Sequence, residues 1–332
     1  MVDLTTAFST LELPTGAFSG LRFSAMPVDE FPNHRIGVDR RGLPCLLVAT
    51  AGGYEASGPP LVLEHVSLQQ GVDCQITEPD GTSEVHRLTL VQCTDSDQTL
   101  RAYFLKICGT IVGVLGNEPT GDDVTRTLQH LVELFRALEK PPRKSVLGIW
   151  SELFVISRAT DVLTLARAWH LRPEERFDFS LGCQRLEVKA ASGRRREHHF
   201  ALEQVVPVSA TQIVIASLLV ERSSAGTSVS DLLTSIRSAA RDDADLLLHI
   251  DEVVAAALGV AWRRAMDERF DDRLAASTLA FFNSGIVPKP TTAPPPEVSE
   301  VHFKSDLSRC AESPLEALRQ AGGLLAAVLP RI

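Results

Sequence analysis

Residues 176–191 read RFDFSLGCQRLEVKAA, and this stretch decides the predicted fold of the second half of the chain. Phenylalanine, leucine and valine residues on both of its arms are typical of β-strands. The Gly182-Cys183 pair between the arms is typical of a turn. The stretch therefore predicts a short, apolar β-hairpin.

Three charged residues interrupt the apolar pattern of this hairpin: Asp178 on the first arm, and Glu187 and Lys189 on the second. Side chains alternate between the two faces of a strand, so Glu187 and Lys189 share the face opposite to the neighbouring leucine and valine. If the hairpin closes at Gly182, Asp178 shares that face with them. The alternation thus predicts that two carboxylates and one ammonium group converge. The alternative is a half-exposed hairpin whose charges point into water and form an incidental salt bridge.

The segment SVLGIWSELFVISRA, residues 145–159, predicts a helix that is apolar on nearly all sides and therefore buried. Glu152 is the only charged residue between Ser145 and Ser157. An isolated buried charge is very unfavourable, so this carboxylate needs a cation or a metal ion beside it. Glu152 is therefore a candidate ligand. The alternatives are a structural ion pair with an arginine and a position at a partly exposed helix edge.

The composition is that of an ordinary globular protein, with 332 residues, of which 44% are hydrophobic and 23% are charged. The length suggests two domains. The start, MVDLTTAFST, predicts no signal peptide, and the longest apolar run, residues 253–262, is too short to span a bilayer. The six cysteines form no CxxC pair, which disfavours a disulfide framework or a zinc ribbon. We therefore expect a protein of the reducing cytoplasm without a membrane segment.

The net charge of −9 argues against a protein that coats nucleic acid non-specifically. It is compatible with a nuclease, whose acidic site is offset by local basic patches. One such patch follows the hairpin directly and consists of Arg194, Arg195 and Arg196, with His198 and His199 after them. This run is either a solvated loop or, beside an acidic cluster, a clamp for phosphate groups.

Residues 1–139 predict a β-rich N-terminal domain that ends in a helix. Turn-forming clusters separate its expected strands, which are residues 44–50, 60–66, 72–77, 84–93 and 99–115. Between Gly121 and Leu138 the apolar residues recur with the spacing of an amphipathic helix. The basic segment KPPRK, residues 140–144, follows. Its two prolines end the helix, and we place a domain boundary there.

The second domain is expected over residues 145–285 and begins with a helix, the hairpin, a helix and a strand. The expected elements after the hairpin are a short helix at 200–206, a strand at 211–221 and helices at 229–240, 244–260 and 263–282. Residues 286–298 hold five prolines and predict a stiff linker, and residues 299–332 predict a C-terminal tail segment. The expected fold class is α/β (α+β), with a mixed sheet in the second domain.

This ordered set resembles the PD-(D/E)XK nuclease superfamily, whose motif is a strand Asp followed by a Glu/Asp-x-Lys strand, often with an acidic residue on the preceding helix. Glu187-Val188-Lys189 matches the second half of the motif, and Phe177-Asp178 stands where the family has Pro-Asp. The stretches GIWSELFVI, DF…LEVKAA and RRREHHFALEQ are similar to a bacterial branch described as PD-(D/E)XK motif protein, found in phage-defence and restriction-like gene neighbourhoods. The motif-level resemblance covers roughly residues 145–222.

The resemblance implies a restriction-endonuclease-like core and a site for Mg²⁺ or Mn²⁺. Asp178 and Glu187 would be the primary oxygen ligands. Glu152 would be a third ligand or would support the other two, and the carbonyl group of Val188 would also face the metal.

The resemblance also implies roles for residues around the metal. Lys189 would orient the attacking water or stabilise the charge of the transition state, and Gln204 would support the lysine or a base. The groups that would hold DNA phosphates are Arg194, Arg195, Arg196 and His198, of which the last two match the R-x-H pattern of the branch.

The sequence thus predicts a metal-dependent DNA endonuclease of bacterial anti-phage defence or restriction. No Walker or dinucleotide-binding glycine pattern occurs, so a motor would have to be a partner. The expected partners are DNA and other defence-operon proteins such as an ATPase/helicase or a methyltransferase, and a homo-oligomer is compatible with the sequence. Two other hypotheses stay open: a catalytically silent interaction or DNA-binding subunit of a defence complex, and a hydrolase or regulator acting on another phosphate ester.

Overall fold

The computed structural model describes residues 4–15, 20–52, 59–170, 176–206, 211–292, 295 and 297–331. The chain forms two compact units. The first comprises Met1–Lys140 and Arg241–Ala255, and the second comprises Pro141–Ala240 and Ala256–Ile332. The first break between them falls directly before the two prolines of KPPRK, where a helix cannot continue.

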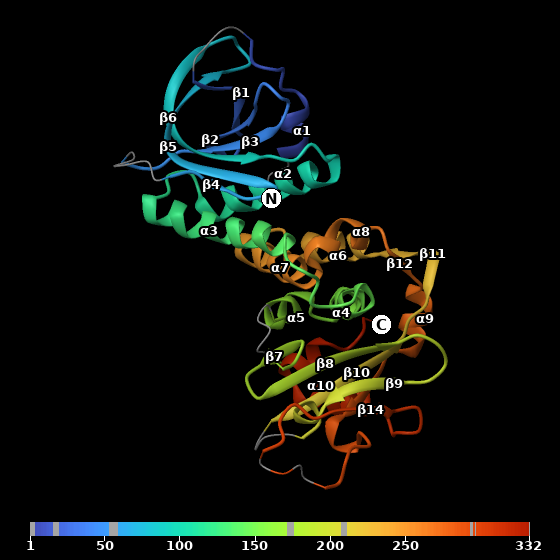
Figure 1. Ribbon diagram of the computed structural model, residues 1–332. Helices are drawn as coiled ribbons and strands as arrows, with labels where there is room; N and C mark the ends of the chain where they lie inside the picture. Colours follow the sequence, from blue (N-terminus) through green and yellow to red (C-terminus); the bar gives the residue numbers. More distant parts are fainter. Residues whose placement is uncertain are drawn as a thin grey trace. The chain divides into compact units, whose positions relative to one another are not determined.

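Six strands form the sheet of the first unit: β1 (Leu21–Val28), β2 (Phe31–Val38), β3 (Pro44–Val48), β4 (Leu61–Val62), β5 (Val66–Thr77) and β6 (Ser83–Cys93). They pair in the order β1-β2-β3-β6-β5-β4, and a parallel pairing of β1 with β5 closes five of them into a barrel, drawn blue to cyan in Figure 1. Alternate side chains point inwards, and Phe23, Leu47 and Ile76 lie in its buried core.

The helices of the first unit are α1 (Leu4–Ser9), α2 (Gln98–Leu115), α3 (Gly121–Leu138) and most of α7 (Ala244–Leu258). The amphipathic helix predicted from Gly121 to Leu138 is confirmed. The strand predicted at 99–115 is wrong, because these residues form α2. The Asp97 carboxylate accepts a hydrogen bond from the Leu100 backbone N–H at 2.9 Å and starts the helix. Most of its side chains are buried, so packing overrides their strand propensity.

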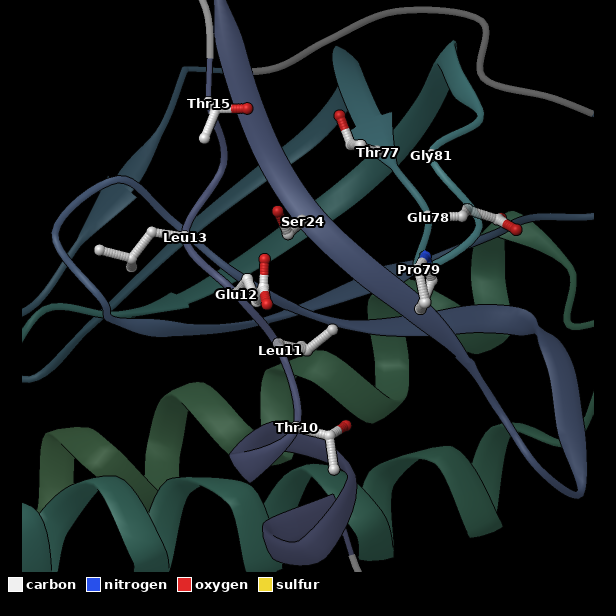
Figure 2. Close-up of a pocket in the computed structure, with 10 residues that line it drawn as sticks. All are labelled: Thr10, Leu11, Glu12, Leu13, Thr15, Ser24, Thr77, Glu78, Pro79 and Gly81. Atoms are coloured by element: carbon white, nitrogen blue, oxygen red, sulfur yellow. The ribbon is translucent and has the colours of Figure 1, made fainter.

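The first unit also carries a pocket of about 350 Å³. Figure 2 shows its lining, which comes from the segment after α1, from Ser24 of β1, from Thr77 of β5 and from the turn between β5 and β6. Hydroxyl groups and the carboxylates of Glu12 and Glu78 dominate this lining, and Glu78 is ion-paired with Arg35 at 3.1 Å. None of the residues predicted to form the site lines this pocket.

The second unit is built on a mixed four-stranded sheet in the order β13-β10-β8-β7, with β7 (Phe179–Leu181), β8 (Gln184–Ala191), β10 (Gln212–Leu219) and β13 (Ala280–Asn283). β7 and β8 form the predicted antiparallel hairpin, β10 runs parallel to β8, and β13 runs antiparallel to β10. Helices α4 (Val146–Arg158) and α11 (Gly323–Ala327) contact β8 (Figure 1). The predicted mixed sheet and the predicted helix with Glu152 are thus confirmed.

β9 (Glu197–Ala201), the next strand along the chain after the hairpin, pairs with β14 (His302–Asp306) from near the end of the chain to form a two-stranded sheet (Figure 1). The other elements of this unit are α5 (Val162–Ala168), β11 (Arg222–Ser228), α6 (Val229–Ala239), α8 (Trp262–Met266), β12 (Arg269–Phe270), α9 (Asp272–Thr278), α10 (Leu315–Ala321), and the short 3₁₀ turns η1 (Leu202–Gln204), η2 (Gly259–Ala261) and η3 (Ser284–Ile286).

Several boundaries of the second half differ from the sequence prediction. The helix expected at 200–206 is the end of β9 followed by η1, and the helix expected at 263–282 is split into α8, β12, α9 and β13. The expected tail segment, residues 299–332, belongs to the second unit, because β14 pairs with β9. Short strands such as β9 and β13 form because they pair with strands that are distant in the sequence, and the local sequence pattern carries no information about these partners. The expected linker, 286–298, lies partly outside the described residues.

Within the part of the chain that the structure describes, no helix combines the length and the apolar character needed to cross a membrane.

Candidate active site

The hairpin brings its charged residues together as the alternation predicts. β7 and β8 pair with Phe179 opposite Leu186, and this register, continued by one residue, sets Asp178 opposite Glu187. The tight connection is made at Gly182, whose φ of 54° is a left-handed conformation that favours glycine. The Asp178 Oδ2 atom accepts a hydrogen bond from the Val188 backbone N–H at 2.8 Å, so the carboxylate is fastened to the neighbouring strand.

Glu152 lies on α4 with only 3% of its surface exposed, as expected for the charged residue of a buried helix. Its Oε2 atom accepts a hydrogen bond from Trp169 Nε1 at 2.8 Å. Its Oε1 atom lies 2.6 Å from the Nζ atom of Lys144, which also lies 2.6 Å from Asp178 Oδ1. One ammonium group thus bridges Glu152 and Asp178, and we call these three residues the Lys144 bridge.

The sequence prediction had missed Lys144. It had assigned the cation beside Glu152 to a metal or an arginine, although the basic KPPRK segment immediately precedes the helix. The signal was therefore present as a lysine one residue before the helix cap, Ser145. What the sequence lacked was the fold that carries this lysine to a hairpin 34 residues further along the chain.

The second carboxylate of the motif, Glu187, has its own cation. Lys189 Nζ lies 2.7 Å from Glu187 Oε1, and we call these two residues the Lys189 pair. Gln204 Nε2 donates a hydrogen bond to the same oxygen at 2.7 Å, and the Gln204 side-chain carbonyl accepts one from the Ala201 backbone N–H at 3.1 Å. Lys189 also lies 5.5 Å from the centroid of the Phe200 ring. The structure therefore brings Glu187, Lys189 and Gln204 together.

Burial and mutual repulsion shift the pKa values of the carboxylates in this cluster. Burial raises the pKa of Glu187 to about 7, with the charge of Asp178 adding to the effect and the Lys189 ammonium group opposing it. Burial likewise raises the pKa of Glu152 to about 8, again with a contribution from Asp178 and with Lys144 in opposition. Burial acts to lower the pKa of Lys144, but Asp178 and Glu152 outweigh it and raise that pKa above its usual range.

The carboxylate oxygens of the cluster are the type of ligand that a hard divalent cation such as Mg²⁺ prefers. The Oε2 atom of Glu187 is buried and has no hydrogen-bond partner among the described residues, which is costly for a carboxylate unless a cation satisfies it. Asp178 is close enough to raise the pKa of Glu187. Among the described residues no group of three or more His, Cys, Asp or Glu side chains is arranged to hold a metal, and the Lys144 ammonium group lies between Glu152 and Asp178.

The basic run after the hairpin divides into exposed and buried members. Arg194 and Arg195 are exposed and line a cleft of about 440 Å³. Arg196 instead points inwards, where Nη1 donates to the Ser217 carbonyl at 2.8 Å and Nη2 donates to the Thr278 carbonyl. His198 is only 2% exposed, and its Nε2 atom lies 2.8 Å from Ser217 Oγ. The structure thus separates Arg196 and His198 from the two outer arginines.

Strand register explains this division. Along β9, His198 and Phe200 are buried, while Glu197 and His199 face outwards. His199 and its cross-strand partner Lys304 of β14 line the same cleft as the arginines. The sequence prediction chooses His198 of the adjacent pair because it matches the R-x-H pattern of the branch, and it assigns residues 299–332 to a tail segment, so Lys304 is not considered. A period-two pattern over 197–201 could have pointed to His199.

The comparisons with known proteins bear on the whole chain. A family model described as "Putative PD-(D/E)XK family member (DUF4420)" matches residues 4–308. The chain belongs to this PD-(D/E)XK family. No curated protein and no solved structure matches it. The family assignment agrees with the resemblance carried by Asp178, Glu187 and Lys189, and the match extends through the N-terminal barrel, well beyond residues 145–222.

Proposed function

We propose that this chain is a metal-dependent DNA endonuclease that hydrolyses phosphodiester bonds. The observation that carries the proposal is the meeting of Asp178, Glu187 and Lys189 on one hairpin in a member of the PD-(D/E)XK family, with the buried Glu187 Oε2 atom left without a partner among the described residues. A phosphodiester repels an incoming anion, so its hydrolysis needs positive charge and an activated water at the same place.

The residues that would hold Mg²⁺ or Mn²⁺ are Asp178 and Glu187, with Glu152 as a third ligand or a support and with the Val188 carbonyl beside them. When bound, such an ion lowers the pKa of a water molecule and offsets the charge of the phosphate. Trp169 holds the orientation of Glu152 through its hydrogen bond, and Gln204 does the same for Glu187.

Lys189 is the group that we assign to the reacting phosphate. Its position on β8 is fixed by the strand, by the ion pair with Glu187 and by the contact with the Phe200 ring. A preorganised ammonium group of this kind stabilises the negative charge that develops on the phosphate oxygens and orients the attacking water.

The cleft lined by Arg194, Arg195, His199 and Lys304 is the surface that we assign to the DNA backbone. Ala190 and Ala191, the two residues that follow Lys189 on β8, also line this cleft, so we place the DNA backbone next to the strand that carries the lysine. Glu197 lies in the cleft as well and forms ion pairs with Arg195 and Lys304, which orient the two cations in the absence of DNA. Arg196 and His198 lie behind this surface and support the strand that carries it.

The biological setting that we propose is bacterial anti-phage defence or restriction, with partner proteins encoded nearby, as the resemblance of the motifs to that branch implies. A catalytically silent interaction subunit is the second candidate. One observation favours it: Lys144 and Lys189 already pair with all three carboxylates, so each carboxylate has a cation beside it without a metal ion. The enzyme and the silent subunit differ in one respect that is simple to measure, which is strand cleavage.

Purified protein on supercoiled plasmid and on phage DNA tests the proposal, with Mg²⁺, Mn²⁺ or EDTA, alone and together with the neighbouring gene products. We expect nicking or linearisation with a divalent ion, none with EDTA, and loss of cleavage in Glu187→Gln. If the wild type cleaves nothing in any mixture, and Glu187→Gln protects cells from phage as well as the wild type does, the silent-subunit hypothesis replaces the enzyme.

A further inference from the structure

The site contains a second lysine that the PD-(D/E)XK motif does not account for. Lys189 is the lysine of the motif and is engaged with Glu187. Lys144 comes from outside the motif, and its ammonium group lies 2.6 Å from Glu152 Oε1 and 2.6 Å from Asp178 Oδ1. It therefore lies between two of the three carboxylates that would hold a divalent cation.

Both oxygens of Asp178 are engaged, but by donors of different kinds. Oδ2 accepts a hydrogen bond from the Val188 backbone N–H, which belongs to β8 and cannot leave unless the strand moves. Oδ1 accepts from the Lys144 side chain, which can leave by rotation about its own bonds. A cation that binds Asp178 is repelled by an ammonium group on Oδ1, so Lys144 is the donor that has to withdraw.

The setting of Lys144 permits this withdrawal. It lies in an irregular segment between Pro142 and the N-cap of α4, and its side chain is 36% exposed, against 4% for Glu152 and 11% for Asp178. The backbone N–H groups of Arg143 and Lys144 both donate to the Ala257 carbonyl, at 2.9 and 3.1 Å. The backbone of this segment is thus anchored, while the Lys144 side chain is partly exposed.

Charge balance favours an exchange over a simple addition. The cluster holds three carboxylates and two ammonium groups, so it carries a charge of −1 when all five are ionised. A divalent ion that replaces the ammonium group of Lys144 brings this charge to zero, whereas a divalent ion that joins both lysines brings it to +1. Buried sites are most stable close to neutrality.

We propose that Lys144 is the resident cation of this site: it holds Glu152 and Asp178 while no divalent ion is bound, and it swings from Asp178 into solvent when a divalent ion binds. The inference rests on the proposed metal-dependent function. It gives the protein a folded metal-free state whose ligands are already in place. It also makes Lys144 a competitor of the metal rather than a group that reacts with DNA.

Calorimetric titration of metal-free protein with Mn²⁺ at pH 8 tests the exchange. Lys144→Met removes the ammonium group and keeps the aliphatic stem. Arg143→Met is the matched control, because it removes a positive charge one residue earlier, on an exposed side chain. We expect Lys144→Met to bind Mn²⁺ on the order of tenfold more tightly than the wild type, and Arg143→Met to bind like the wild type.

The outcomes separate the inference from the proposed function. If the wild type binds Mn²⁺ and Lys144→Met binds it equally or more weakly, the resident-cation inference is overturned and the proposed metal site stands. If neither protein binds Mn²⁺, the metal site of the proposed function is overturned, and the inference with it. If Lys144→Met binds and the wild type does not, Lys144 excludes the metal more strongly than we expect, which supports the inference.

Amine labelling of the wild type keeps the inference testable even if Lys144→Met does not fold. With EDTA we expect slow acylation of Lys144, because its ammonium group is held by two carboxylates. With saturating Mn²⁺ we expect severalfold faster acylation of Lys144, while Lys140 outside the cluster is unchanged, as read by peptide mass spectrometry. Equal labelling of Lys144 with EDTA and with Mn²⁺ would overturn the inference.

Discussion

The two lysines of the site hold their carboxylates in different ways. Lys189 lies in the middle of β8, is 20% exposed and pairs with Glu187 two residues earlier on the same strand. Lys144 lies outside any helix or strand, is 36% exposed and spans carboxylates of two different elements. The strand therefore fixes the backbone of Lys189 beside Glu187, whereas in the described part of the chain the ion pairs of the Lys144 side chain are those with Glu152 and Asp178.

The largest expected difference between the two lysines is in the rate of DNA cleavage. Lys189→Ala removes the group that we assign to the transition-state charge, and we expect the rate to fall by about 10² to 10³, roughly 3–4 kcal/mol. Lys144→Met should keep most of the wild-type rate at saturating metal, because under the proposed exchange the Lys144 side chain of the wild type has also left the site once the metal is bound. Single-turnover cleavage assays measure both. Equal reductions in the two variants would mean that both lysines act on the phosphate.

The buried His198, whose pKa is affected by the charge of Lys189, links the stability of the folded protein to pH. Burial lowers the pKa of His198 from 6.5 to about 4, with help from the charges of Lys189 and Arg196. Between these values the unfolded chain binds a proton that the folded protein does not. The free energy of unfolding should therefore fall as pH falls from 6.5 to 4, by up to roughly 3 kcal/mol.

Urea unfolding at a series of pH values measures this decrease, with His198→Gln as the control that lacks the titrating group. Lys189→Met should raise the pKa of His198 in the folded protein and so narrow the pH range over which the free energy of unfolding falls. Lys144→Met should leave that pH range unchanged. A wild-type profile that is identical to that of His198→Gln would show that His198 is not buried in its neutral form.

Asp178 belongs to the Lys144 bridge and to the hairpin, so its variants separate the two contributions to stability. Asp178→Ala leaves the Val188 N–H without its acceptor and Lys144 with one carboxylate, and we expect a destabilisation of roughly 1–3 kcal/mol.

Asp178→Asn is the matched variant, because its amide oxygen can still accept from Val188. We expect it to be more stable than Asp178→Ala in chemical denaturation and equally unable to bind Mn²⁺. Equal stability of the two variants would mean that the hydrogen bond to β8 contributes nothing measurable.

The smallest expected effect concerns the cleft beside the site. Arg194→Gln with Arg195→Gln should reduce the slope of log K against log salt for duplex DNA by about 0.9 for each phosphate group that the variant no longer neutralises. Arg196→Gln should leave that slope unchanged and lower stability instead, because its guanidinium group donates to Ser217 and Thr278. Fluorescence anisotropy at several salt concentrations distinguishes the two. A reduced slope in Arg196→Gln would reverse this assignment.

The parts of the site that could be predicted from the sequence are those that depend on neighbouring residues. Alternation along one strand placed Glu187 and Lys189 together, and the apolar pattern of α4 indicated that Glu152 needs a cation or a metal ion beside it if it is buried. The identity of that cation was out of reach, because Lys144 meets Asp178 only through the tertiary fold.

The same limit applies to the fold. Residues 98–115 are rich in β-branched and aromatic side chains, and only their burial on most sides makes them a helix. The choice between His198 and His199 depended on the register of β9, which is set by its pairing with β14, a distant strand near the end of the chain. Local periodicity carries no information about such distant partners.

The measurement that tests the central claim most directly is single-turnover cleavage of plasmid or phage DNA, by the wild type and by Lys189→Ala, with Mg²⁺ and with EDTA, in the presence of the neighbouring gene products. We expect cleavage by the wild type with Mg²⁺ only, and a rate about 10² to 10³ lower in Lys189→Ala with metal binding intact. Equal cleavage by both proteins, or wild-type cleavage that persists in EDTA, would contradict a metal-dependent site built on Asp178, Glu187 and Lys189.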